Sequence, residues 1–127
     1  MKILTPEQIL ILHEELVNKY GGSSGIRDKG MFESAINRPF ATFGGNDLYP
    51  DIYLKAGAFI QAVVKDHPFV DGNKRTAFAG AFVFLKINKI YLQVKKSEGV
   101  KFMINVANKN LSVEEISTWL KKHSKKI

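Results

Sequence analysis

The sequence predicts an all-α fold, a compact bundle of about six helices with a short β-hairpin at most. Three observations favour this class. Apolar residues recur at helical spacing along most of the 127 residues, helix-capping signals precede these stretches, and only one short run is rich in β-forming residues. A hydrophobic content of 45% suits one domain with one core, so residues 1–127 are expected to form a single domain.

The first half of the chain predicts three helices. Residues 5–8 form a capping box with a proline at its first helical position, and the apolar face that follows extends to about Tyr20, where glycines end it. Asp28 is expected to cap a second helix, which stops near the next proline. Residues 44–47, Gly-Gly-Asn-Asp, predict a turn, and Pro50 and Asp51 begin a third helix.

The second half predicts three more helices. Small and large apolar residues surround the segment 73–88 on most sides, which indicates a central, buried helix. Residues 90–94, Ile-Tyr-Leu-Gln-Val, form the one β-like run. A further helix is expected over 97–108, and Ser112 is expected to cap the last one.

Charge and composition limit the classes of function. The chain has 19 Lys+Arg against 12 Asp+Glu, a net charge of +7, and no cysteine. It shows no apolar stretch of membrane-spanning length and no secretory leader, so a cytoplasmic protein is expected. Lysines gather in the last third, which fits nucleic-acid binding, an acidic protein partner or a solvated surface. These lysines are Lys95, Lys96, Lys101, Lys109, Lys121, Lys122, Lys125 and Lys126.

Residues 67–75, His-Pro-Phe-Val-Asp-Gly-Asn-Lys-Arg, are the segment richest in chemical groups. They open onto the expected helix at residue 73, whose first main-chain N–H groups have no partner within the helix. These N–H groups, the positive end of the helix dipole and the cations Lys74 and Arg75 together predict an anion-binding site. Gly72, which lacks a Cβ, lets an anion approach the backbone closely.

The other members of this loop suggest chemistry beside a phosphate. Asp71 suits Mg²⁺, a cation that prefers carboxylate, phosphate and water oxygens. His67 is of the residue type that titrates near neutral pH and can act as a general base toward a hydroxyl. Phe69 is expected to point into the core and anchor the loop. Each residue alone also fits a plain turn or helix cap, but their combination before a helix indicates a site.

Residues 67–77 resemble the signature of the Fic/Doc superfamily. The Fic form reads His-Pro-Phe-x-x-Gly-Asn-Gly-Arg and continues to a further arginine, whereas the Doc (death-on-curing) form has lysine in place of the second glycine, as Lys74 is here. Four other stretches are also similar to the Doc branch, as are the length and the all-helical plan, so the overall resemblance covers nearly the whole chain. The four stretches are Tyr20-Gly21-Gly22, residues 26–30, residues 33–39 and residues 84–88.

This resemblance implies a role for each loop residue. His67 would deprotonate a hydroxyl of a target protein, and Asp71 would hold Mg²⁺ on the phosphates of ATP. Residues 72–75, which are Gly72, Asn73, Lys74 and Arg75, would form the anion-binding nest. The segment from about Arg27 to Arg38 would correspond to the flap, which aligns a target peptide by strand-like pairing and includes Asp28.

Two departures from the Fic form bear on the reaction. Lys74 replaces the glycine that leaves room for an α-phosphate in adenylyl-transferring members, and Phe78 and its neighbours supply no second arginine to grip the distal phosphates. In the Doc branch this combination goes with transfer of the γ-phosphoryl group to translation elongation factor Tu. The resemblance therefore implies a toxin with protein kinase activity, and AMP transfer to a protein hydroxyl is the alternative.

The resemblance also bears on regulation. Fic-type enzymes are commonly restrained by an internal segment of the form [Ser/Thr]-x-x-x-Glu-[Gly/Asn], and no Ser or Thr of this chain has Glu four residues later. Such a toxin is instead neutralised in trans by a small antitoxin, whose C-terminal segment folds along a groove. The charge of +7 suits a partner of this kind, which is often acidic.

Two other classes compete with this interpretation. A non-catalytic basic module could bind nucleic acid or a protein through the lysine-rich third, although this third lacks interleaved exposed aromatic residues, a zinc pattern and a clear recognition helix. A metal hydrolase is disfavoured because His13, His67 and His123 are far apart and show no His-x-x-x-His spacing. His13 and His123 are interpreted as residues on the polar faces of the terminal helices.

Overall fold

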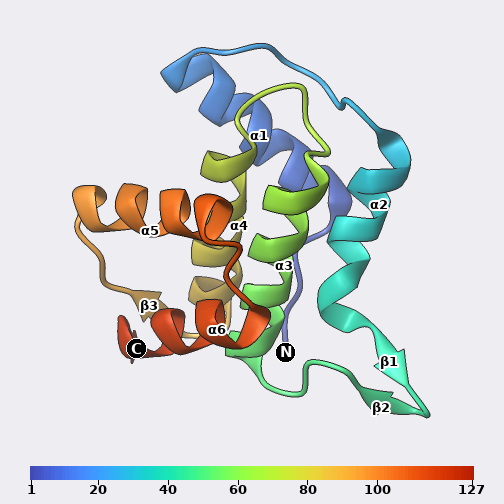
Figure 1. Ribbon diagram of the computed structural model, residues 1–127, viewed down its shortest axis with the longest axis vertical. Helices are drawn as coiled ribbons and strands as arrows, with labels where there is room; N and C mark the ends of the chain where they lie inside the picture. Colours follow the sequence, from blue (N-terminus) through green and yellow to red (C-terminus); the bar gives the residue numbers. More distant parts are fainter.

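The computed structural model describes residues 1–127 and consists of six α-helices, one 3₁₀ turn and two small antiparallel strand pairs. It confirms the predicted all-α bundle (Figure 1). The helices are α1 (Pro6–Tyr20), α2 (Lys29–Asn37), α3 (Ile52–Asp66), α4 (Asn73–Ile87), α5 (Lys96–Asn108) and α6 (Val113–Lys122), and the 3₁₀ turn is η1 (Arg38–Phe40). None of the helices combines the length and apolar character needed to cross a membrane.

The helix ends follow the predicted capping signals. The Thr5 hydroxyl accepts from the N–H of Gln8 while the Gln8 side chain accepts from the N–H of Thr5, which completes the capping box of α1. Asp28 and Asp51 accept from the third helical N–H of α2 and α3, respectively. Ser112 caps α6 in the same way. Local sequence thus determines where four of the six helices begin.

The central helix is α3, which corrects the prediction that residues 73–88 fill this place. All the residues of α3 from Lys55 to Val64 are buried except the half-buried Gln61, because α2, α4, α5, α6 and η1 pack around it. In α4 only one face is buried, and Phe78 and Phe82 on its other sides are half-exposed. The two helices pack closely, since a Cβ at Gly80 would lie 2.6 Å from the Phe59 ring.

Two strand pairs lie at the edges of the bundle. β1 (Thr42–Phe43) and β2 (Asn46–Asp47) form a hairpin around the predicted turn, where Gly44 and Gly45 both have positive φ. β3 (Ile90–Leu92) lies in the predicted β-like run and pairs with β4 (Ser124–Lys126), which the sequence did not indicate. The β1–β2 hairpin lies at the opposite end of the molecule from the α3–α4 loop (Figure 1).

A buried lysine holds the hairpin against the bundle. Lys55 is 3% exposed, and its Nζ donates to the main-chain oxygen of Tyr49 at 2.6 Å and contacts Asp47 Oδ2 at 3.2 Å. The Lys55–Asp47 contact is the single ion pair of the protein. A charge this deeply buried is stabilised by its oxygen partners, so the segment between η1 and α3 is fixed through one side chain.

Candidate active site

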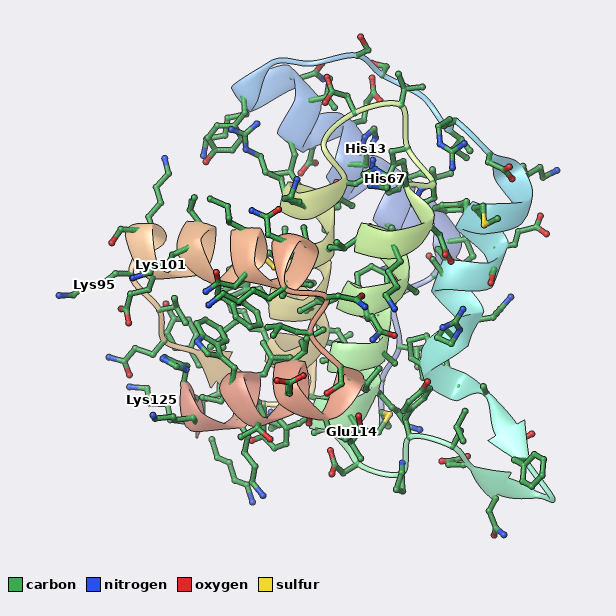
Figure 2. All side chains as sticks on the ribbon, viewed as in Figure 1. His13, His67, Lys95, Lys101, Glu114 and Lys125 are labelled. Atoms are coloured by element: carbon green, nitrogen blue, oxygen red, sulfur yellow. The ribbon has the colours of Figure 1, made fainter.

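The predicted site occupies the loop between α3 and α4. His67 ends α3 in the left-handed region, with φ 46 and ψ 58, and its N–H donates to the oxygen of Val63. Gly72, also left-handed with φ 75, precedes α4, so two reversals of the backbone bound a loop of only six residues. The side chain of His67 is exposed at this turn. Figure 2 shows His67 at the same end of the bundle as His13.

The residues just before α2 support the loop from its outer side. Ile26 and Phe69 form an antiparallel bridge, in which the N–H of Arg27 donates to the oxygen of Pro68 at 2.7 Å and the N–H of Val70 donates to the oxygen of Gly25 at 3.0 Å. This pairing satisfies main-chain groups that would otherwise be free in an irregular loop. Residues 68–70 of the loop thus pair with residues 25–28 as two very short antiparallel strands would.

Arg27 makes a second connection to the end of α3. Its Nε donates to the main-chain oxygen of His67 at 2.6 Å, and its Nη2 donates to that of Asp66 at 2.8 Å. Carbonyl groups in the last turn of a helix lack partners within the helix, and a cation there also opposes the negative end of the helix dipole. Arg27 thereby fixes the turn that presents His67.

Asn73 supports the loop from within. Its side chain, buried at 8% exposure, accepts from the N–H of Phe69 and donates to the oxygen of Phe69, both at 3.0 Å. The same amide nitrogen lies 3.4 Å from Nδ1 of His67, a long contact that does not commit the imidazole to one tautomer. Phe69 is 1% exposed, so its side chain lies in the core, while its role as the anchor of the loop stays a prediction.

The interpretation of His13 as a residue on the polar face of its helix was wrong. It is 2% exposed, its ring stacks on that of Phe69 with centroids 3.9 Å apart, and its Nε2 lies 2.8 Å from the main-chain oxygen of Asp71. The ring thus packs beneath the loop and donates to it. His123 is half-buried, and its Nδ1 donates to the main-chain oxygen of Trp119.

The carboxylate of Asp71 is exposed but is held in place by main-chain groups. Its Oδ1 accepts from the N–H of Gly72 at 3.0 Å, and its Oδ2 accepts from the N–H of Ser23 at 3.3 Å. Gly22 has φ 112, a conformation that favours glycine, and a Cβ there would also lie 2.8 Å from Oδ2 and displace the carboxylate. The end of α1 and the loop thus meet at this carboxylate.

The donor set around Asp71 fits Mg²⁺ rather than a closed metal site. No group of three or more His, Cys, Asp or Glu side chains gathers anywhere in the protein. A metal held by Asp71 would need phosphate and water oxygens to complete its shell, and Mg²⁺ is the ion that binds in this way. The residues present thus fit Mg²⁺, and the assignment of Asp71 to the metal stays a prediction.

The start of α4 has the features of the predicted anion site. The N–H groups of Asn73, Lys74 and Arg75 precede the first intrahelical bond, from the N–H of Thr76 to the oxygen of Gly72. Lys74 and Arg75 are exposed beside them. His67, Asp71 and residues 72–75 all line one hollow of ≈ 630 Å³, which continues between the end of α1 and α5. The predicted base, metal ligand and phosphate-binding residues are therefore brought together.

Only the first part of the segment assigned to a target-aligning flap lies beside the loop. Residues 29–37 are helical and cannot pair along a strand, and Asp28 is the N-cap of α2. Arg38 begins η1 at the opposite end of α2 from the loop. The strand-like part is confined to residues 25–28, and it pairs with the loop itself. The expected strand-like flap thus needs correction over 29–37, while a role in target alignment stays a prediction.

Sequence reasoning missed two residues that shape the site. His13 follows Ile9 and precedes Val17 by four residues each, so it continues the buried stripe of α1, and this spacing was a usable signal. Tyr20 lies with its ring 4.5 Å from the guanidinium carbon of Arg75. No pattern in the sequence connects Tyr20 with Arg75, because their contact depends on how α1 crosses α4.

Comparison with known proteins decides the family. The model of the Fic/DOC family matches residues 3–85, which is more than half of the chain and includes the whole loop. The chain belongs to the Fic/DOC family. It is similar to toxin Doc of Mycolicibacterium smegmatis, with 39% identity over 105 residues that cover 80% of this chain and 79% of that protein. It is also similar to protein kinase doc of Escherichia phage P1, with 28% identity over 122 residues, 96% of this chain and 95% of that protein.

These relatives place the chain in the Doc branch of the Fic/DOC family. It is a transferase of the Fic/Doc kind and the toxin of a toxin–antitoxin system, with an antitoxin as partner. The family match ends at residue 85, within α4, so α5 and α6 lie outside it.

Proposed function

We propose that this Fic/DOC protein is a kinase that transfers the γ-phosphoryl group of ATP to a hydroxyl of a target protein, elongation factor Tu, and thereby arrests translation. The observation that carries the proposal is the shared hollow, in which His67 and Asp71 lie beside the cations of α4. Lys74 in the cradle and phenylalanine at position 78 favour phosphoryl over adenylyl transfer. The relative from phage P1 is named a protein kinase.

The residues of the site have distinct tasks in this reaction. The target hydroxyl loses its proton to the His67 imidazole as its oxygen bonds to the γ-phosphorus, and the bond from that phosphorus to the bridging oxygen breaks, which leaves ADP. Main-chain N–H groups of residues 73–75 bind phosphate oxygens, and Lys74 and Arg75 offset their charge. Mg²⁺, which Asp71 would hold, neutralises charge on the phosphates when bound.

The decisive experiment is intact mass spectrometry of elongation factor Tu after incubation with the purified protein, ATP and Mg²⁺. A mass increase of one phosphoryl group supports the proposal, and an increase of one AMP group replaces it with adenylyl transfer. The His67→Ala variant should slow modification by about 10²–10⁴-fold, because the general base is lost. If neither the unaltered protein nor His67→Ala modifies the factor, elongation factor Tu is not the target. We place the reaction in the cytoplasm, so other cytoplasmic proteins would then be assayed.

The second part of the proposal concerns the antitoxin, which we place along the groove between α1 and α4. Apolar side chains line most of this groove, among them Ile3, Leu4, Ile11, Leu12, Val83 and Ile87. Ile3 and Ile11 are 53% and 59% exposed, so a partner could bury both. Ile11→Glu should abolish co-purification of a co-expressed antitoxin while leaving phosphoryl transfer intact. If the variant still binds the antitoxin, the partner docks elsewhere.

A further inference from the structure

The hollow that contains the predicted active site extends well beyond the loop. Its far side is lined by Lys95, the N-cap residue of α5, and by Lys96 and Gly99 within that helix, and its apolar floor includes Phe78. The helix α5 comes close to α4 here, because a Cβ at Gly99 would lie 3.3 Å from the Phe78 ring. The absence of a side chain at Gly99 thus lets the lysine-bearing end of α5 approach the start of α4.

Four cations surround this hollow without an acidic partner. Lys74, Arg75, Lys95 and Lys96 line it, yet the only ion pair in the protein is formed by Lys55 and Asp47 at the hairpin. The carboxylate of Asp71 accepts from two main-chain N–H groups, and that of Glu98 accepts from the N–H of Lys95. Like charges gathered over an apolar floor repel one another, and an anionic ligand would relieve this repulsion.

The ring of Tyr20 brings two of these cations to one place. The guanidinium carbon of Arg75 lies 4.5 Å from the ring centroid, and Nζ of Lys96 lies 5.5 Å from it. Lys19 Nζ lies 5.3 Å from the same centroid. Cations at these distances are attracted to an aromatic ring. Because both lie so near one centroid, Arg75 and Lys96 are no more than 10 Å apart at the edge of the hollow.

We propose that Arg75 and Lys96, gathered at Tyr20, form a second phosphate subsite beside the cradle of residues 72–75, with the Arg75 side chain shared between the cradle and the subsite. This subsite takes a phosphate group of a polyphosphate other than the one bound in the cradle. Lys96 thereby supplies, from a helix outside the family match, a cation like the one that the Fic form carries at the position of Phe78. The inference rests on the proposed function, since it requires a polyphosphate nucleotide as ligand.

The test measures binding by isothermal titration calorimetry with two probes, inorganic tripolyphosphate and inorganic phosphate. Lys96→Gln should weaken the binding of tripolyphosphate about tenfold, since one charge-assisted contact is lost, and should leave that of phosphate unchanged. Lys122→Gln is the matched control, because it removes the same charge from an exposed position on α6. Its affinity for tripolyphosphate should equal that of the unaltered protein.

A second pair of variants tests the orienting role of the ring. Tyr20→Phe keeps an aromatic face and should bind tripolyphosphate normally, whereas Tyr20→Leu should weaken its binding by several-fold. Tyr20 is 41% exposed, so both variants should fold, which circular dichroism can check. Equal affinity of Lys96→Gln and Lys122→Gln for tripolyphosphate would overturn the subsite and leave His67-dependent phosphoryl transfer standing. If the unaltered protein binds neither tripolyphosphate nor a non-hydrolysable ATP analogue, both proposals fail.

Discussion

His13 Nε2 donates a hydrogen bond to the main-chain oxygen of Asp71 at 2.8 Å, from a ring that is stacked beneath Phe69. Because a carbonyl oxygen only accepts, Nε2 carries a hydrogen in this contact. The N–H and C=O of a trans peptide point in opposite directions, so this bond turns the N–H of Gly72 outward, where it meets the Asp71 carboxylate. One buried side chain of α1 thus sets the last peptide of the loop, directly before α4.

We predict that the donor, more than the aromatic ring, makes His13 important for activity. His13→Phe keeps the stacking on Phe69 but leaves the oxygen of Asp71 without its donor, which should cost about 1–3 kcal/mol and reduce target phosphorylation. His13→Gln places an amide N–H near the position of Nε2 and should recover most of the activity. Rates of target modification and thermal unfolding of both variants provide the measurement. A larger loss in His13→Gln than in His13→Phe would show that the ring matters instead.

Arg27 should be important for the stability of the α3–α4 turn. Arg27→Ala removes both bonds to the oxygens of Asp66 and His67, and we expect the free energy of unfolding to fall by about 1–2 kcal/mol in urea titrations. Arg27→Lys keeps the charge but lacks the forked donors, so it should restore only part of this loss. A stability of Arg27→Ala equal to that of the unaltered protein would refute the role of these bonds.

Lys55 should contribute to folding without affecting the site. Lys55→Met has similar length but leaves the oxygen of Tyr49 and the carboxylate of Asp47 without their donor, so unfolding should become easier by about 1–3 kcal/mol. Asp47→Asn should have a smaller effect, because the side chain of Asp47 is 53% exposed and retains an acceptor oxygen. Tripolyphosphate affinity should stay unchanged in both variants, since the hairpin lies at the far end of α3.

The capping box of α6 should make folding sensitive to acid. The main-chain N–H of Ser112 and, to a lesser extent, its hydroxyl lower the pKa of Glu115 below its ordinary value. Because the folded pKa is the lower one, this carboxylate stabilises the fold above its unfolded pKa, and the contribution is lost as pH falls through the folded pKa. NMR titration of Ser112→Ala should show the pKa of Glu115 moving upward, part of the way to the ordinary value. An unchanged pKa would exclude the hydroxyl as a cause.

Local signals in the sequence were enough to predict the helices. Thr5, Asp28, Asp51 and Ser112 cap the helices that they were expected to cap, because an N-cap bond involves only residues within one turn. The residues that line the hollow beside the loop could also be identified from the sequence, because the predicted base, the carboxylate and the cations are close together in it. The strand β4 could not be predicted from local signals. Its Ser-Lys-Lys sequence shows no alternation of polar and apolar residues, and it forms a strand only because β3 lies beside it.

The supports of the site escaped prediction for a related reason. His13 looked like a surface residue because histidine is polar. Its spacing from Ile9 and Val17 pointed to the buried face of α1, but the acceptor that makes its burial favourable is presented by a distant loop. The centrality of α3 likewise depends on which helices surround it, whereas its own apolar face resembles that of α4. Residues that act through long-range contacts carry little local signal, and in this protein Tyr20 and Arg27 belong to the same class.

Because Lys55 and Asp47 form the single ion pair of the protein, ionic strength should affect the stability of the fold and the binding of phosphates differently. With one partly buried pair to screen and a net charge of +7 to shield, added salt should leave the fold as stable as before or more so. The same salt should weaken the capture of phosphates by unpaired cations. Buffer composition thus offers a way to remove ligand from the toxin while the toxin stays folded.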